Sequence, residues 1–298
     1  MGIDYHGLKF LRYVHGKRPF GSVVTIGRQG LHLPPWKVRE ILDLKTLTDF
    51  GAYGERLMME CFGATSVDSY DNSDYESATH VWDMNRALVP EKKYDTIVDF
   101  GCLEHVYNVA QALKNVSSLA NPGAQIIHVL PSNGFCGHGF WQFSPELFFS
   151  LYSEQNGYRD TEVFLADLAD ERSWFIVKKP RGGKRADVVT SQEMYVLVRT
   201  TIEQTFSHDS VQQSDYTFAW DKSTAWTDKS SDKSAAGHST AREVTKPRAD
   251  ERPRPATAVV RWGLRLAVKR IEAAFRRTSL NGTNPFLTRI DVPGRRET

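Results

Sequence analysis

The sequence predicts an α/β protein with a doubly wound, mostly parallel sheet, and two observations support this fold class. First, residues 94–131 read as a strand, a loop, an amphipathic helix, a turn and a second strand. A strand–helix–strand unit of this length forms a right-handed parallel crossover. Second, strand and helix patterns alternate through residues 20–200. With 298 residues, 40% of them hydrophobic, the chain can bury one large core or two modest ones.

Each element of this crossover unit has a local cause. Residues 96–99 are a β-branched run that ends in an acid. Asn108 can cap the helix that follows, and apolar side chains recur along one face of that helix at Val109, Leu113, Val116 and Leu119. Residues 121–123, Asn-Pro-Gly, are expected to stop the helix and turn the chain. Residues 125–130 are a nearly continuous apolar run, which is typical of a strand covered on both faces.

Further strands and helices are predicted before this unit. Strands are predicted at 22–26, 64–68 and 80–82, and helices at 36–44 and 54–62. The second helix ends at Gly63, a favourable C-terminal stop. In parallel sheets of this type, ligands bind beyond the carboxyl ends of the strands. We therefore expect the site at the loops that follow the strands, including residues 99–105 and 131–139.

The chain after the unit is predicted to complete the sheet. Ser144 and Pro145 mark a helix start, the helix continues through residues 147–156, and it stops at Gly157. Strands are predicted at 158–168, 173–178 and 193–200, with the first and last forming the terminal hairpin. Residues 211–220 keep aromatic side chains and are expected to pack back on the domain.

The C-terminal quarter differs in composition from the rest. We expect a domain at 1–220, a disordered linker at 221–257 that is rich in polar and charged residues, a basic amphipathic helix at 258–277 and a tail at 278–298. Such a helix can lie on an anionic membrane surface, contact a protein partner or dock on its own domain. The sequence leaves these three alternatives open.

Composition excludes several classes of function. The net charge is +2, so bulk nucleic-acid binding is not expected. Three scattered cysteines are too few for a disulfide framework, which fits a reducing cytosol. The chain shows no signal peptide and no apolar run long enough to span a bilayer. These observations predict a cytoplasmic protein, with peripheral membrane contact possible only through 258–277.

The crossover unit also carries a family resemblance. The run YDTIVDFGCLEHV, then a helix, then NPGAQIIHVLP resembles the late half of a class I S-adenosylmethionine (SAM) dependent methyltransferase. Ala124 stands where that family usually has a second glycine. A weaker form of the likeness covers roughly residues 20 to 200. The resemblance implies a Rossmann-like methyltransferase fold with a seven-stranded sheet whose last strand is antiparallel, and SAM as the cofactor.

The resemblance also implies a set of cofactor-binding residues. These are Gly27, Arg28, Gly30, Asp68, Asp83, Met84 and Phe100. Gly27 and Gly30 would form the loop that approaches the ligand, although this chain has GRQG in place of the family's GxGxG. Arg28 could bind the SAM carboxylate or, in another ligand, a phosphate. Phe100 would border both cofactor and substrate.

Two acids are assigned to the adenosine end of the cofactor. Asp68 would accept hydrogen bonds from the ribose hydroxyls, and replacing it by alanine would then weaken cofactor binding without unfolding the protein. The alternative is that Asp68 forms a turn. Asp83 would contact the adenine amino group, with Met84 against the ring. Alternatively, Asp83 only ends a strand.

Two histidines are the candidate catalytic residues. His105 could act as a general base near neutral pH, or it could hold its loop by hydrogen bonds. His138 lies in the glycine- and aromatic-rich loop 131–143, whose candidate substrate contacts are Asn133, His138, Trp141 and Gln142. Cys136-Gly-His138 lacks the spacing of a metal site, so no metal is predicted.

We therefore expect a SAM-dependent methyltransferase that acts on a small-molecule or sugar-like acceptor. Methyl transfer depends mainly on holding the acceptor in line with the sulfonium. Two alternatives belong to other classes of function. One is a catalytically inactive, methyltransferase-like binding or scaffold protein, which the reduced glycine loop favours. The other is a doubly wound domain that binds a different nucleotide, with Arg28 on a phosphate.

Overall fold

The computed structural model describes residues 2–221, 280 and 284–293. Across these residues, the main element is a nine-stranded sheet. Its strands, in chain order, are β2 (Gly21–Ile26), β4 (Ala64–Asp71), β5 (His80–Val81), β6 (Tyr94–Phe100), β7 (Ala120–Asn133), β8 (Tyr158–Asp167), β9 (Ser173–Val177), β10 (Met194–Ile202) and β11 (Leu287–Asp291). A separate two-stranded sheet consists of β1 (Gly2–Ile3) and β3 (Gly30–Leu31).

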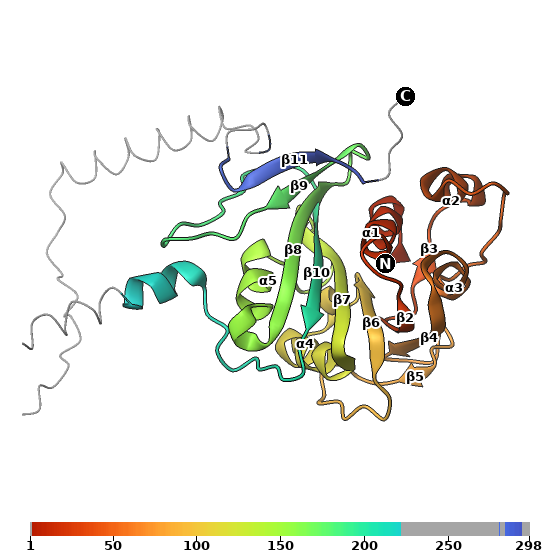
Figure 1. Ribbon diagram of the computed structural model, residues 1–298, viewed down its shortest axis with the longest axis horizontal. Helices are drawn as coiled ribbons and strands as arrows, with labels where there is room; N and C mark the ends of the chain where they lie inside the picture. The colour runs from red at the N-terminus through yellow and green to blue at the C-terminus, as the bar shows by residue number, and fades with distance from the viewer. Residues whose placement is uncertain (1, 222–279, 281–283, 294–298) are drawn as a thin grey trace, which may run out of the picture.

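The strand order of the main sheet is β11-β9-β8-β10-β7-β6-β2-β4-β5. Strands β5, β4, β2, β6 and β7 pair in parallel, whereas β10 lies antiparallel between β7 and β8. This order confirms the doubly wound, mostly parallel sheet and its antiparallel last strand. In the described residues, the main sheet has nine strands in place of the seven implied by the resemblance, because β9 and β11 extend it beyond β8 (Figure 1).

Strand β11 changes the predicted domain limits. It pairs antiparallel with β9, with Arg289 opposite Phe175, so part of the predicted tail at 278–298 completes the sheet edge. The domain is therefore not confined to residues 1–220. The predicted linker at 221–257, apart from Asp221, and the predicted amphipathic helix at 258–277 lie outside the described residues.

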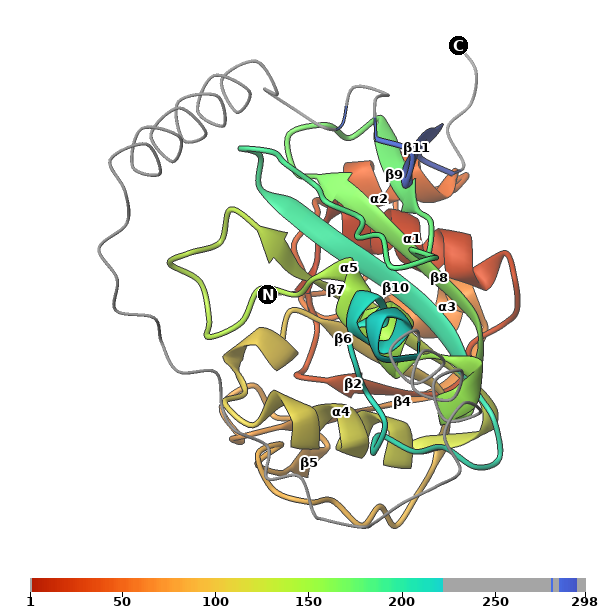
Figure 2. The same ribbon diagram turned by 90° about the vertical axis from the view of Figure 1, so that its left-hand side faces the viewer.

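Helices α1 to α5 cover the two faces of the sheet, and residues 214–221 of the described chain are also helical. The numbered helices are α1 (Tyr5–His15), α2 (Pro35–Leu42), α3 (Glu55–Phe62), α4 (Val109–Ser118) and α5 (Pro145–Leu151), with short 3₁₀ turns η1 (Leu103–His105) and η2 (Glu154–Asn156). Figure 1 shows α1, α2 and α3 together on one side, and Figure 2 shows α4 and α5 on the other. Successive residues of a strand point to opposite faces, so Ile97 packs in the α4–α5 core and Val98 in the α1–α3 core.

The predicted Asn-Pro-Gly turn is the first local correction. Helix α4 begins as predicted, with the Asn108 side chain accepting a hydrogen bond from the Gln111 amide, and it ends at Ser118. Residues 121–123 then form an irregularity inside β7, because Ala120 pairs with Tyr94 whereas the next paired residue of β7 is Gln125. Pairing with β6 on both sides makes this irregularity a bulge within one strand, with Gly123 at a φ of +81°, where the local sequence favours a turn.

The end of β4 is the second correction. The strand was predicted to end at Asp68, but it continues to Asp71. Parallel pairing extends it, with Tyr70 beside Ile26 of β2 and Asp71 beside Val81 of β5. Consequently, the acid at the carboxyl end of this strand is Asp71.

Residues 211–220 pack back on the domain as predicted. The Ser214 amide donates to Glu146 Oε1 over 2.8 Å, and the Arg185 guanidinium forms an ion pair with Asp215 at 2.5 Å.

No helix in the described residues combines the length and apolar character that crossing a bilayer requires.

We predict that Gly157→Ala destabilises the protein more than Gly123→Ala. Both glycines have positive φ, 84° and 81°, so alanine is strained by about 1–2 kcal/mol at either position. At Gly157 the added methyl group would also overlap the Thr205 carbonyl oxygen, whereas no atom lies within 4 Å of that position at Gly123. Urea denaturation of both variants measures the difference in the free energy of unfolding. Equal losses would contradict the close contact at Gly157.

Candidate functional site

The carboxyl ends of β2, β4, β5 and β6 meet at one pocket of about 390 Å³, a size typical of small-molecule sites. We call it the strand-tip pocket. Its lining residues are Gly27, Arg28, Gln29, Tyr70, Asp71, Asn72, Glu76, Trp82, Asp83, Met84, Asn85, Gly101, Cys102, His105 and Val106. Five residues predicted from the sequence therefore come together here, namely Gly27, Arg28, Asp83, Met84 and His105.

Gly27 shapes the floor of the pocket. It follows β2 directly and has φ +72°, a conformation that favours glycine. A Cβ at this position would lie 3.5 Å from Cys102 and 3.6 Å from Gln29 Nε2, in space that the pocket now uses. Buried Gln29 holds the turn by donating to the carbonyls of Ile26 and Gly27 over 2.8 and 3.2 Å. The sequence analysis gave Gln29 no role.

Gly30 and Phe100, the ends of the predicted glycine loop and fourth strand, do not line the strand-tip pocket. Gly30 belongs to β3 and lies beside Gly2 of β1. Phe100 is buried on the opposite face of the sheet, where a Cβ on Gly7 of α1 would meet its ring at 3.1 Å. Gly30 lies away from the pocket because β3 pairs with the N-terminal strand β1. Phe100 points away from it because successive side chains of a strand alternate between the two faces of the sheet.

Asp68 also lies away from the pocket. Its carboxylate accepts hydrogen bonds from Lys92 Nζ over 2.7 Å and the Tyr94 hydroxyl over 2.8 Å. Partial burial opposes ionisation, but these two hydrogen bonds outweigh it and lower the pKa of Asp68. Asp71, three residues further along β4, lines the pocket and accepts from the Arg28 amide over 3.4 Å. The geometry therefore favours Asp71 over Asp68 as the acid that faces a ligand.

The Arg28 guanidinium is already engaged by protein groups. Its Nε lies 2.6 Å from Glu55 Oε1, one Nη donates to the Glu76 carbonyl over 2.6 Å, and its plane lies 3.9 Å from the centre of the Tyr53 ring. Glu55 balances the charge of Arg28, which reduces the attraction that this side chain can exert on a ligand carboxylate or phosphate.

The strand-tip pocket is acidic as a result. Its lining includes three carboxylates, Asp71, Glu76 and Asp83, against the single guanidinium of Arg28. Hydrogen bonds from the Asn85 amide and side chain lower the pKa of Asp83, which keeps it charged near neutrality. Such a pocket favours a cationic ligand over a polyphosphate. This is evidence against the alternative in which Arg28 binds the phosphate of a nucleotide.

A buried hydrogen-bonded chain fixes the loop after β6. Asp99 Oδ2 lies 2.7 Å from His128 Nδ1 on β7, and His128 Nε2 lies 2.7 Å from the Tyr152 hydroxyl. Asp99 Oδ1 accepts from the amides of Cys102 and Leu103 over 3.2 and 3.4 Å. Burial raises the pKa of Tyr152 well above its usual value, so its hydroxyl stays a donor. One carboxylate thus joins β6, β7 and the start of η1.

That loop presents a cluster of Glu104, His105 and His138, which we call the Glu104 cluster. Glu104 is completely buried, and its Oε1 lies 3.6 Å from His105 Nε2 and 3.5 Å from His138 Nε2. The loop after β7 closes over it, because the Phe140 and Trp141 amides donate to the Glu104 carbonyl over 2.7 and 3.3 Å. The structure therefore brings the two candidate catalytic histidines together, with His105 also lining the strand-tip pocket.

Burial dominates the electrostatics of the Glu104 cluster. Removal from solvent, followed by repulsion from Asp99, raises the pKa of Glu104 to about 8. Burial and the neighbouring His138 lower the pKa of His105. At neutral pH, the carboxyl group is therefore mostly protonated and His105 is mostly neutral. The sequence shows Glu104 and His105 as a titratable pair in this loop, but nothing in a local sequence shows that a loop glutamate will be buried.

The other predicted substrate contacts form hydrogen bonds with backbone groups of their own loop or of neighbouring connections. The Asn133 side chain donates to the Gln192 carbonyl over 2.7 Å, and Gln142 Oε1 accepts from the Phe135 amide over 2.9 Å. Trp141 donates from its indole to the Val106 carbonyl over 2.9 Å. Exposed rings beside it, Tyr107 and Phe140, lie 6.1 Å apart edge to face and form an aromatic rim next to the Glu104 cluster.

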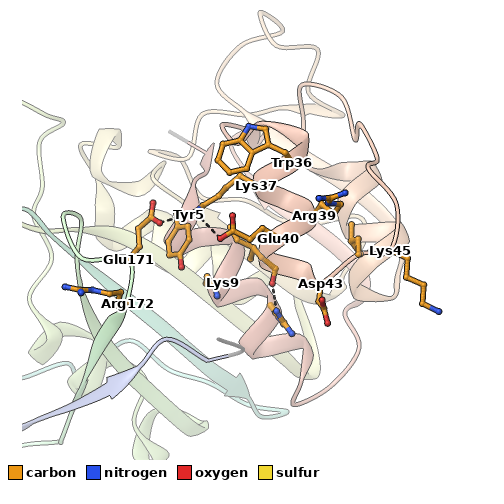
Figure 3. Close-up of a pocket in the computed structure, with 13 residues that line it drawn as sticks. Tyr5, Lys9, Trp36, Lys37, Arg39, Glu40, Asp43, Lys45, Glu171 and Arg172 are labelled. Atoms are coloured by element: carbon orange, nitrogen blue, oxygen red, sulfur yellow. Dashed lines mark hydrogen bonds and ion pairs between the residues drawn. The ribbon is translucent and has the colours of Figure 1, made fainter. Parts of the chain in front are cut away.

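A larger cavity, of about 740 Å³, lies between α1, α2 and the connection from β8 to β9 (Figure 3). It shares no lining residue with the strand-tip pocket. Lys37, at its centre, is paired with Glu40 at 3.3 Å and with Glu171 at 3.2 Å. Since the ligand sites of doubly wound sheets lie at strand ends, we assign the functional site to the strand-tip pocket.

Comparison with known proteins finds a family match over part of the chain. Residues 38–173 match a family described as a methyltransferase domain. No curated protein matches the sequence. Solved structures with some likeness include TehB from Haemophilus influenzae, at 13% identity and a TM-score of 0.39, covering 65% of this chain and 62% of TehB. Another is N-methyltransferase NodS from Bradyrhizobium japonicum with S-adenosyl-L-homocysteine, at 10% identity and a TM-score of 0.34, covering 66% and 85%.

We predict that Glu104 makes the protein less stable as pH rises. Its pKa is 4.5 in an ordinary setting and about 8 in the folded protein. Between these values the unfolded chain releases the proton and the folded chain keeps it, so the free energy of unfolding falls by at most ~1.4 kcal/mol per pH unit. The contribution is fully present below about pH 4.5 and lost as pH approaches 8.

Glu104→Gln should remove this contribution. The groups facing Glu104 are Asp99, His105 and His138, and they remain in the variant, so the difference between parent and variant isolates Glu104. Denaturant unfolding between pH 5 and 8, with a chelator present, measures it. A difference in unfolding free energy that does not change with pH would show that Glu104 has an ordinary pKa.

Proposed function

We propose, from the premise that the chain belongs to the class I SAM-dependent methyltransferases, that the strand-tip pocket holds SAM and that a small-molecule acceptor binds beside the Glu104 cluster. The acidic lining of the pocket is the observation that carries this proposal. SAM, when bound, supplies a methyl group on a positively charged sulfur. Three carboxylates around one neutralised arginine suit such a cation better than they suit a phosphate-bearing ligand.

The adenosine end of the ligand fits the part of the pocket at the ends of β4 and β5. Asp71 at the end of β4 can accept from ribose hydroxyls, and Asp83 after β5 can accept from the adenine amino group. Met84 and Trp82 provide apolar surface for the ring, and Gly27 leaves space at the floor. This assignment keeps the sequence-based roles of Asp83, Met84 and Gly27 and transfers the ribose role from Asp68 to Asp71.

The acceptor side follows from the position of His105. It is neutral at physiological pH and borders the pocket, so it can take a proton from an acceptor hydroxyl or amine. His138 lies next to it, with the two ring centres 4.8 Å apart. The exposed aromatic rim of Tyr107 and Phe140 offers flat apolar faces of the kind that bind sugar-like or other small ring compounds.

We predict that Asp71→Asn weakens binding of S-adenosylhomocysteine about 10- to 100-fold, the effect of losing a hydrogen bond to a charged group. Isothermal titration calorimetry measures it. The matched control is Asp68→Asn, whose native partners are Lys92 and Tyr94, and it should change affinity less than about 2-fold while lowering stability. Loss of binding in the Asp68 variant alone would restore the original assignment.

The proposed reaction has its own test. Methyl transfer from labelled SAM should be detected with some member of a panel of small hydroxyl and amine compounds, including sugars. ATP should not compete with S-adenosylhomocysteine, since the pocket is acidic. Binding of S-adenosylhomocysteine without turnover of any compound would favour the scaffold alternative, and failure of both SAM and S-adenosylhomocysteine to bind at millimolar concentration would refute the proposal.

A further inference from the structure

We infer that Glu104, His105 and His138 form a binding site for one divalent transition-metal ion, with Zn²⁺ as the reference ion. One carboxylate oxygen and two imidazole nitrogens from these residues all lie within 4.8 Å of one another. The cluster was not expected from the sequence, because His138 comes from the loop after β7 and the other two residues from the loop after β6.

The strongest evidence is the state of the Glu104 carboxyl group. It is fully buried, and in the described chain neither of its oxygens has a hydrogen-bond partner. His138 Nε2, which faces it, is likewise buried at the atom and without a hydrogen bond among the described residues. Buried carboxyl groups are normally hydrogen-bonded, paired with a charge or bound to a metal. A cation between these atoms would satisfy all of them at once.

The distances suit a metal better than a shared proton. Glu104 Oε1 is 3.5 Å from His138 Nε2 and 3.6 Å from His105 Nε2, which is long for a hydrogen bond. Around a tetrahedral Zn²⁺ with bonds of about 2.0–2.1 Å, ligand atoms lie roughly 3.3–3.4 Å apart. The two histidine side chains are partly exposed, so small rotations can close the remaining gap.

The donor set defines the class of ion. Two imidazoles and one carboxylate suit Zn²⁺, Fe²⁺, Co²⁺ or Ni²⁺, whereas Mg²⁺ and Ca²⁺ prefer sites made of oxygen atoms. The surrounding backbone is well fixed, because Asp99 holds the start of η1 and the Phe140 amide holds the Glu104 carbonyl. A fixed backbone around three convergent ligands is what a preformed metal site requires.

Three protein ligands leave coordination positions for water or for an oxygen of another molecule. Since His105 also lines the strand-tip pocket, the ion would lie between that pocket and the aromatic rim. There it could orient an acceptor hydroxyl and lower the pKa of that hydroxyl. With the ion bound, His105 would be a ligand, and the ion would replace it as the group that activates the acceptor hydroxyl. This last step rests on the proposed function, whereas the metal site itself does not.

Calorimetric titration of the chelator-treated full chain with Zn²⁺ tests the site. We expect one ion per chain, with a dissociation constant in the micromolar range or below. Glu104→Gln and His138→Gln should each weaken binding at least about 100-fold, since ligand loss exceeds the roughly 10- to 100-fold effect of supporting residues. The control His32→Gln removes an exposed histidine outside the cluster, and Cys136→Ser removes the nearby thiol. Both controls should bind as the parent does.

Absence of stoichiometric Zn²⁺ uptake by the parent would overturn the inference, as would parental affinity in both cluster variants. Circular dichroism establishes that each variant is folded, and if Glu104→Gln unfolds, His138→Gln and His105→Gln decide. Binding of S-adenosylhomocysteine is measured in parallel. Zn²⁺ binding without S-adenosylhomocysteine binding would refute the proposed function and support the metal site. Binding of S-adenosylhomocysteine without Zn²⁺ binding would refute the metal site and support the proposed function.

Discussion

Burial of the Asp99 carboxylate is the constraint on which the site depends. An acid at the end of a central strand, removed from solvent, requires partners for both of its oxygens. One oxygen meets His128 and, through it, Tyr152, and the other accepts the two amides that begin η1. The same carboxylate therefore anchors the sheet interior to the loop that carries Glu104 and His105. Removing it would leave a buried imidazole and two amides unpaired, a costly arrangement.

Charge neutralisation inside the protein determines which ligands the pocket favours. The sequence shows an arginine in the loop after the first strand, and that residue alone suggests an anionic ligand. In the fold, Glu55 of α3 and the Glu76 carbonyl satisfy the guanidinium, and Tyr53 covers its plane. The other charged residues that line the pocket, Asp71, Glu76 and Asp83, are acidic. The arrangement explains how a chain with a reduced glycine loop can still present a site suited to a sulfonium compound.

The Glu104 cluster depends on a different feature, the meeting of two loops. The loop after β6 contributes Glu104 and His105, and the loop after β7 contributes His138 and the backbone amides that bind the Glu104 carbonyl. Because both loops leave adjacent parallel strands at the same edge of the sheet, they are close in space although distant in the sequence. The meeting of the loops places the buried carboxyl group of Glu104 between the imidazoles of His105 and His138, and burial raises its pKa.

The sequence by itself determined the class of fold, most strand and helix positions, the Asn108 cap and five residues of the pocket. Those predictions succeeded because they rest on local periodicity, on capping and on the rule that sites follow parallel strands. It misplaced the end of β4, because pairing with β2 and β5 extends that strand to Asp71, and for this reason we propose Asp71 in place of Asp68 as the ribose acid. Only the tertiary structure decided that Arg28 is neutralised and that Glu104 is buried. Charge balance and burial are set by residues remote in the chain, so no local pattern can show them.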